Sequence, residues 1–151
     1  MATRRQVQTP TGLRVGFVST RLAGTDGVSL ETAKWVTMLE RLGHTCFYLA
    51  GQLDTPPERS RLVPEAFWKH PDIDEIQVAA FSLPTRPPEI TNRIYKLTAY
   101  LKEQLYAFVR DFQIELLIVQ NALAIPMNIP LGIALTELIA ETGLPTIGRR
   151  K

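Results

Sequence analysis

The residues best suited to ligand chemistry form a short glycine-containing segment, Gly24-Thr25-Asp26-Gly27, in a loop that runs from Thr20 to Val28. Glycines let a backbone pass close to a ligand, and the free N–H groups at a helix start recognise anions or hydroxyl groups. Asp26 is suited to cap that helix, and its carboxylate would repel a permanently bound pyrophosphate. A turn with a helix cap and a ligand-binding loop are both compatible with this pattern.

Known nucleotide-binding patterns do not match this loop. The segment lacks the spacing G-x-G-x-x-G of dinucleotide-binding domains, and the chain contains no phosphate-loop pattern G-x-x-x-x-G-K-[ST]. Functions as an NAD-dependent oxidoreductase or a simple nucleoside triphosphatase therefore lose their main support.

Two further loops carry polar residues that could line the same crevice. The first spans residues 120–130 and contains Asn121 and Asn128, whose amides both donate and accept hydrogen bonds and so could orient a polyhydroxylated ligand. The alternative is that these amides only satisfy local backbone groups, as turn residues commonly do. The second loop contains Gly51, Gln52 and Asp54, which add polar groups without a specific chemistry.

The remaining candidates for metal or nucleophilic chemistry have ordinary structural explanations. His44 and His70 lack the spacing of metal ligands or of a catalytic base, and surface or strand-edge positions are expected for both. Cys46 lies within an apolar run, which predicts a buried and unreactive thiol. We expect no metal site and no bound cofactor.

The elements that position these loops alternate along the chain. Apolar runs predict strands, and apolar spacings of three and four residues predict helices. The first helix is expected to bury Trp35, Met38, Leu39 and Leu42 and to stop at Gly43; the stretch through Phe67 and Trp68 receives no assignment. The expected strands are 13–19, 45–50, 76–81 and 114–120, and residues 144–147 begin a fifth strand. The later helices are expected at 90–111 and 130–141, and Gly143 caps the second of them.

This alternation predicts an α/β fold with an open, mostly parallel Rossmann-like sheet and helices on both faces. In such a sheet, ligands bind beyond the carboxyl ends of the strands, where all three loops are expected. We divide the chain into a flexible tail, residues 1–12, and one domain, residues 13–151.

The composition of the chain limits the classes of molecule that it is expected to bind. Of the 151 residues, 45% are hydrophobic, and 17 Lys and Arg nearly balance 15 Asp and Glu. A net charge of +2 provides no broad electrostatic footprint for nucleic acid or an anionic membrane. No signal peptide and no transmembrane segment is expected, which favours a cytoplasmic protein that binds small molecules or another protein domain.

Two blocks of sequence resemble a known family. They are Val15-Gly16-Phe17-Val18-Ser19-Thr20 with Gly24-Thr25-Asp26-Gly27-Val28-Ser29-Leu30-Glu31 and Leu42-Gly43-His44, and the stretch 120–132 with Glu141-Thr142-Gly143-Leu144-Pro145-Thr146. Together they resemble the N-terminal domain of retaining glycosyltransferases with the GT-B fold, in the glycogen-synthase-like group. The likeness spans nearly the whole chain.

The resemblance implies an enzyme of two Rossmann-like halves, with a nucleotide-diphosphate sugar as substrate, transfer with retention at the anomeric carbon, and no obligatory metal. The N-terminal half would mainly hold the acceptor, a sugar or another small molecule. The residues that the resemblance places in the donor and acceptor cleft are Gly24, Thr25, Asp26, Gly27, Val28, Asn121 and Asn128.

The chain departs from the family pattern at its end. Members of this branch continue past the strand at Pro145-Thr146-Ile147 into a histidine-rich segment and then a C-terminal nucleotide-sugar-binding domain, whereas this sequence reads Gly148-Arg149-Arg150-Lys151. We therefore expect a truncated N-terminal domain that is inactive alone and that self-associates through a surface its partner domain would cover. The alternative is a non-catalytic α/β binding or interaction module that keeps the fold without the chemistry.

Overall fold

A computed structural model describes residues 12–67, 69–82, 87–120 and 128–149. The strands are β2 (Arg14–Val18), β3 (Thr45–Ala50), β4 (Ser60–Leu62), β5 (Leu116–Gln120) and β6 (Thr146–Arg149). The helices are α1 (Gly27–Arg41), α2 (Pro71–Ser82), α3 (Pro88–Phe112) and α4 (Ile129–Thr142), with 3₁₀ turns η1 (Pro57–Arg59) and η2 (Pro64–Ala66).

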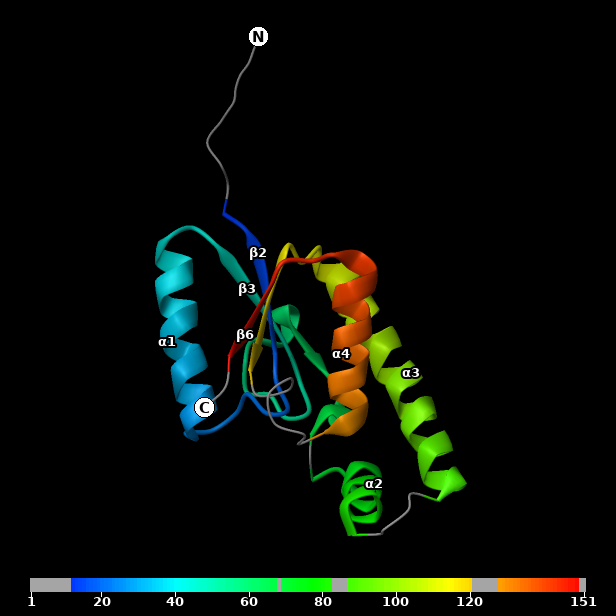
Figure 1. The fold of residues 1–151 in the computed structure, drawn as a ribbon. Coiled ribbons are helices and arrows are strands. Elements are labelled where there is room, and N and C mark those ends of the chain that lie inside the picture. Colours follow the sequence, from blue (N-terminus) through cyan, green and yellow to red (C-terminus); the bar gives the residue numbers. More distant parts are fainter. Residues whose placement is uncertain (1–11, 68, 83–86, 121–127, 150–151) are drawn as a thin grey trace.

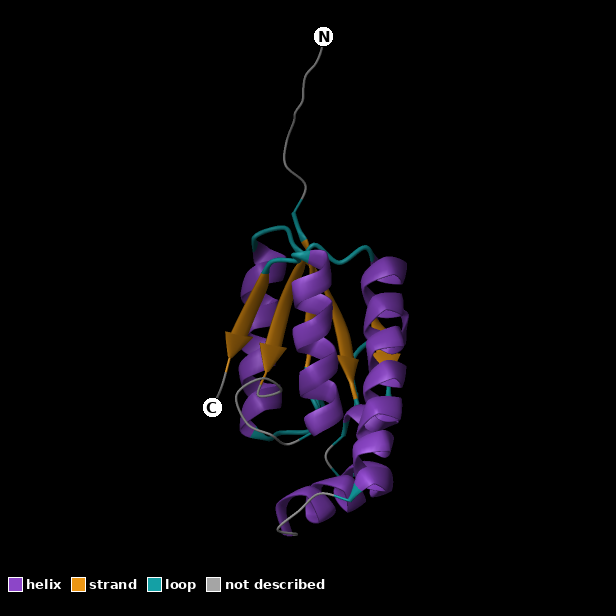
Figure 2. Ribbon diagram, turned by 45° about the vertical axis from the view of Figure 1, so that its right-hand side comes forward, coloured by secondary structure: helices purple, strands orange, loops and turns teal. Residues whose placement is uncertain are grey.

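The five strands form one open sheet in which every pair of neighbours is parallel. The spatial order is β4-β3-β2-β5-β6, and all the arrowheads point the same way in Figure 2. The chain therefore moves outward from β2 through β3 to β4, crosses back to β5 and continues outward to β6. This arrangement confirms the predicted open parallel sheet and places the reversal of strand order between β2 and β5.

Helices cover both faces of the sheet, as predicted (Figure 1). Connections that leave a parallel sheet in opposite directions put their helices on opposite faces when both crossovers are right-handed. Alternate side chains of the strands then face the two layers. Val15, Phe17, Cys46, Tyr48 and Ala50 pack with α1, whereas Val18, Phe47, Leu49, Leu117 and Val119 pack with α3 and α4.

One predicted strand is wrong. Residues 76–81 belong to α2, which packs against α3 through Ile76, Ile90 and Ile94 and through an ion pair between Arg93 and Glu75. A short apolar run does not distinguish a strand from a buried helix. The signals that decide for a helix precede the run: Pro71 at the first helical position and two aspartates in the first turn.

The third strand of the sheet is instead β4, in the stretch to which the sequence analysis gave no element. This strand has three residues, Ser60, Arg61 and Leu62, and it pairs only with the end of β3. Its brevity and polar character suit the edge of a sheet. They also explain why hydrophobic periodicity did not reveal it.

The buried stripe of α1 also differs from the prediction. Met38 is 47% exposed within α1, and Leu42, which is 67% exposed, lies beyond the last helical residue Arg41 as the C-cap. The residues of α1 that face the sheet include Val28, Trp35, Val36 and Leu39, together with the buried Thr32. The predicted helices 90–111 and 130–141 and the cap at Gly143 are confirmed to within two residues.

The predicted burial of the cysteine is confirmed. Cys46 is fully buried, and this burial raises the pKa of its thiol to about 12, so the group stays protonated near neutral pH. Within the described residues, no helix is long and apolar enough to cross a membrane.

Gly16 sets how closely α3 lies on the sheet. A Cβ at this position would come within 2.8 Å of the Phe108 ring and 3.0 Å of Ile114 Cγ2. Phe108 is fully buried in the core that α3 and α4 form with the sheet. The ring therefore occupies the volume that a side chain at position 16 would need.

We predict that Gly16→Ala lowers the free energy of unfolding by about 1–3 kcal/mol, the usual cost of overpacking a core. Urea unfolding followed by circular dichroism measures it. In a Phe108→Leu background the same substitution should cost less, because the ring that it meets is gone. An equal cost in both backgrounds would contradict this packing.

A charged cluster joins the exposed sides of α3 and α4. Lys102 binds both Glu137 and Glu141, and the Tyr106 hydroxyl donates to Glu141 at 2.6 Å. Hydrogen bonds from Lys102 and then from Tyr106 hold the pKa of Glu141 below its ordinary value of 4.5. A carboxyl group with a depressed pKa stabilises the fold above its unfolded-state pKa and loses that contribution as the pH falls through its folded-state pKa.

The stability of the wild type should therefore fall more steeply than that of Lys102→Met when the pH is lowered from about 5 to about 3. Urea midpoints across this range measure the slope. Lys96→Met, at an exposed position on the same helix, should retain the wild-type slope. A Lys102→Met variant as acid-sensitive as the wild type would contradict the assignment.

Candidate functional site

The candidate site lies at the carboxyl edge of the sheet. The β2–α1 loop, the β3–β4 connection and the starts of α1 and α4 all lie at this edge (Figures 1 and 2). Helix α2 lies beyond this edge and packs against the first turns of α3. The edge between β2 and β5 is the place where open α/β sheets bind ligands, because the flanking loops diverge there.

The glycine segment forms the turn from β2 into α1. Gly24 has a φ of +78°, a conformation that L side chains rarely adopt. Asp26 caps α1, since its Oδ1 accepts from the Ser29 N–H at 2.9 Å. Gly27 opens the helix, and its N–H and that of Val28 have no hydrogen-bond acceptor among the described residues. The structure thus realises the cap and leaves two amides available at the helix start.

Arg21 is a polar centre of this loop that the sequence analysis missed. Its Nη1 lies 2.8 Å from Asp26 Oδ2, and its Nε donates to Gln52 Oε1 at 2.9 Å. Its Nη2 would be 2.9 Å from a Cβ at position 24, so the guanidinium lies against the glycine. Arg21 therefore supplies a positive charge beside the turn and neutralises the capping carboxylate.

Backbone hydrogen bonds join the β2–α1 loop to the β3–β4 connection. The Leu22 N–H donates to the Gln52 carbonyl, the Asp54 N–H donates to the Leu22 carbonyl, and the Gly51 N–H donates to the Thr20 carbonyl. Leu22 and Leu53 also form a parallel bridge. The pairing of β2 with β3 thus continues past the ends of both strands, and it holds the two loops in a fixed relation.

Asp54 completes this connection from the side chain. Its Oδ2 accepts from the Gly24 N–H at 2.9 Å. The loop that contains Gln52 and Asp54 therefore contacts the glycine turn directly. Gln52 binds Arg21, and Asp54 binds the Gly24 N–H.

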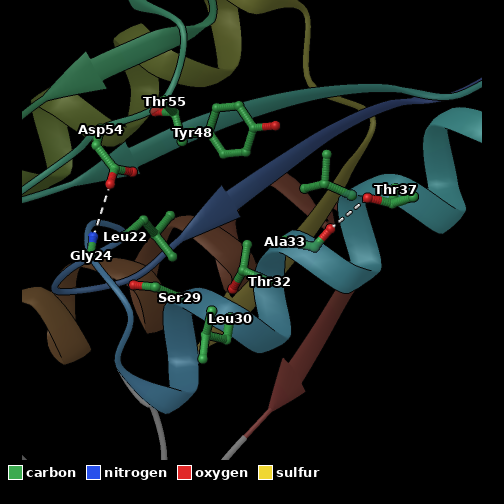
Figure 3. Close-up of a pocket in the computed structure, with 11 residues that line it drawn as sticks. Leu22, Gly24, Ser29, Leu30, Thr32, Ala33, Thr37, Tyr48, Asp54 and Thr55 are labelled. Atoms are coloured by element: carbon green, nitrogen blue, oxygen red, sulfur yellow. Dashed lines mark hydrogen bonds between the residues drawn. The ribbon is translucent and has the colours of Figure 1, made fainter.

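A pocket of about 310 Å³ opens between α1 and the β3–β4 connection (Figure 3). Leu22 and Tyr48 are its buried residues from the strand side, and they are 3% and 5% exposed. Asp54 and Thr55 line one wall. The remaining lining residues are Gly24 and the α1 residues Ser29, Leu30, Thr32, Ala33, Val36 and Thr37.

A buried hydrogen bond links this pocket to the centre of the sheet. Gln120, the last residue of β5, donates through Nε2 to Thr32 Oγ1 at 3.0 Å. Both side chains are at least 95% buried. The bond fixes α1 against β5 at the point where the strand order reverses.

Asn128 is not brought to the glycine turn by any contact among the described residues. Asn128 caps α4 through its Oδ1, which accepts from the Leu131 N–H at 3.0 Å, and its Nδ2 donates to the Glu65 carbonyl at 2.8 Å. Both ends of this amide are therefore used within the fold. Asn121 lies outside the described residues, as does the rest of the loop through residue 127.

The histidines have structural partners. The Nδ1 atoms of His44 and His70 accept from the backbone N–H groups of Leu13 and Asp72. Across the part of the chain that the structure describes, no group of three or more His, Cys, Asp or Glu side chains could hold a metal ion.

Comparisons of the chain with protein families, curated proteins and solved structures find no match.

Three residues of the pocket region were missed as site residues, although the sequence contains a signal for two of them. Tyr48 shares the period-two alternation of Cys46 and Ala50, which assigns it to the same face as the first helix. Gln120 is a polar residue that ends an otherwise apolar strand, a position typical of the ligand edge. Thr32 has no comparable signal, because buried threonines in helices are unremarkable in sequence.

We predict that Asp26→Ala lowers the free energy of unfolding by about 0.5–2 kcal/mol through loss of the helix cap. Asp26→Ser keeps a capping oxygen and loses the Oδ2 contacts, which are the partly exposed ion pair with Arg21 and a hydrogen bond from the Ser29 hydroxyl, so it should cost less than Asp26→Ala. Urea unfolding measures both variants. Equal destabilisation by serine and alanine would show that the cap is not the stabilising element.

Proposed function

We propose that this chain is the acceptor-side half of a glycosyltransferase that moves a sugar from a nucleotide-diphosphate donor with retention. The observation that carries the proposal is the Gly24 turn, which lies where the strand order reverses and leads into the free N–H groups of Gly27 and Val28. A second Rossmann-like domain would supply the opposite wall of the cleft and most contacts to the nucleotide.

Each part of the turn has a role under this proposal. Gly24 lets the backbone approach the donor, and the two free amides offer hydrogen bonds to developing negative charge on its phosphate. Arg21 adds a positive charge beside them. The hydrogen bonds that Gln52 accepts from Arg21 and that Asp54 accepts from Gly24 hold this arrangement before the donor binds, which reduces the entropic cost of ordering it during transfer.

The test compares the chain alone with any longer polypeptide that its reading frame is found to encode beyond codon 151. Transfer is measured across a panel of nucleotide-diphosphate sugars and sugar acceptors. We expect no transfer by the chain alone and transfer with retained anomeric configuration by the longer protein. A longer protein that transfers no sugar from any donor would contradict the proposal.

In the active protein, Gly24→Ala should lower kcat/KM by about 10- to 100-fold, because a displaced loop misplaces the reacting groups. Gly143→Ala is the matched control. Gly143 also has a positive φ, +67°, but it lies at the end of α4 with open space around it. A similar loss of activity in both variants would mean that backbone strain alone, and not the cleft, explains the effect.

One observation favours the alternative of a non-catalytic α/β binding module. The start of α1 already holds its own anion, the Asp26 carboxylate, paired with Arg21 at 2.8 Å. Under this alternative the ion pair is permanent and no phosphate enters. Tight binding of a protein or small ligand by the chain alone, with no second domain in its reading frame, would select this alternative.

A further inference from the structure

The pocket beside α1 is lined by a tyrosine whose hydroxyl group has no hydrogen-bond partner among the described residues. Tyr48 is 5% exposed and lines the pocket, and its hydroxyl forms no hydrogen bond with the described residues. Its ring is stacked on Phe17, with the ring centroids 6.1 Å apart, so its position is set by the core. A ligand in the pocket would provide an acceptor for this hydroxyl group.

The charge state of Tyr48 defines what it offers. Burial raises the pKa of this phenol well above its ordinary value of 10.0, so the hydroxyl stays protonated and can donate a hydrogen bond. Figure 3 shows Tyr48 between Asp54 and Thr55 on one side and the helix that bears Thr32 and Thr37 on the other.

Asp54 offers the complementary acceptor. Its Oδ2 is bonded to the Gly24 N–H, while its Oδ1 has no partner among the described residues. The carboxylate disfavours an anion in this pocket, whose lining includes no cationic side chain. Thr32 accepts from Gln120, which leaves its own hydroxyl proton free to donate.

The rest of the lining is apolar. Leu22, Leu30, Ala33 and Val36 contribute hydrocarbon surface next to these polar groups. The volume of about 310 Å³ is at the small end of the range for ligand pockets. A compact molecule with an apolar face and several hydroxyl groups matches both the size and the chemistry.

We propose that this pocket binds an uncharged polyhydroxylated ring, with the Tyr48 hydroxyl donating to a ring oxygen and the Asp54 carboxylate accepting from ring hydroxyls. A monosaccharide and the ribose of a nucleoside share this chemistry. The inference deepens the proposed function and rests on it for one point, that a ring bound here belongs to the sugar acceptor or the donor.

The experiment titrates the ¹⁵N-labelled chain with neutral monosaccharides, a cyclitol and nucleosides in separate arms, and with inorganic phosphate and methylamine as charged probes. We expect saturable amide shifts centred on Gly24, Ser29, Ala33 and Thr55 with a neutral ring. The arm that saturates at lower concentration identifies a sugar or a nucleoside as the source.

Tyr48→Phe keeps the stacked ring and removes only the hydroxyl. It should raise the Kd about 2- to 12-fold, the effect of one hydrogen bond. Tyr106→Phe is the matched control, because it removes a hydroxyl that binds Glu141 on the opposite layer, and it should leave the Kd unchanged. Ala33→Phe should abolish the shifts by filling the mouth of the pocket, where Ala33 is exposed.

Three results would overturn the inference: no saturable shift with any neutral ring, tighter binding of phosphate or methylamine at the Ala33 and Thr55 amides, or an unchanged Kd in Tyr48→Phe. Its failure is distinguishable from that of the proposed function. Ring binding by the chain, without sugar transfer by the longer protein, would support the pocket and contradict the transferase. Sugar transfer that is unchanged in Tyr48→Phe would support the transferase and contradict the pocket.

Discussion

The pairing of β2 with β5 is the constraint on which the rest of the structure depends. Strands β3 and β4 lie on one side of β2, whereas β5 and β6 lie on its other side. The crossover connections therefore run in opposite directions, and α1 and α4 cover opposite faces of the sheet. The loops that follow β2 and β5 must then separate at the carboxyl edge. The buried bond from Gln120 to Thr32 secures this junction, since it ties the end of β5 to the helix that follows β2.

Both backbone and side-chain hydrogen bonds fix the polar groups at this edge. The Leu22–Leu53 bridge and the neighbouring backbone bonds extend the β2–β3 ladder into the loops. Arg21 and Asp54 then add side-chain bonds across the same interval. Groups fixed in this way lose little conformational entropy when a ligand binds, which makes even a small pocket effective.

The sequence was most informative where hydrophobic periodicity was strong. The buried strands β2, β3 and β5 and the long helix α3 follow from their apolar patterns, and the parallel sheet follows from their alternation. The strand predicted at 76–81 failed because a short apolar run suits a helix equally, and β4 was missed because three residues at an edge carry almost no pattern. The Gly24 turn and its cap by Asp26 were visible as local chemistry. Partners distant in the chain were not, since Arg21 with Gln52 and Thr32 with Gln120 meet only through the strand order.

The length of α3 makes the two sides of the carboxyl edge different. Its 25 residues extend about 38 Å, whereas the five residues of β5 extend about 17 Å. The excess carries α2 past the strand ends on the side of α3 and α4 only (Figure 2). The far side, where α1 begins, has no such overhang among the described residues. Among the described residues, the Gly24 turn therefore lies on the side of the carboxyl edge that α2 leaves uncovered.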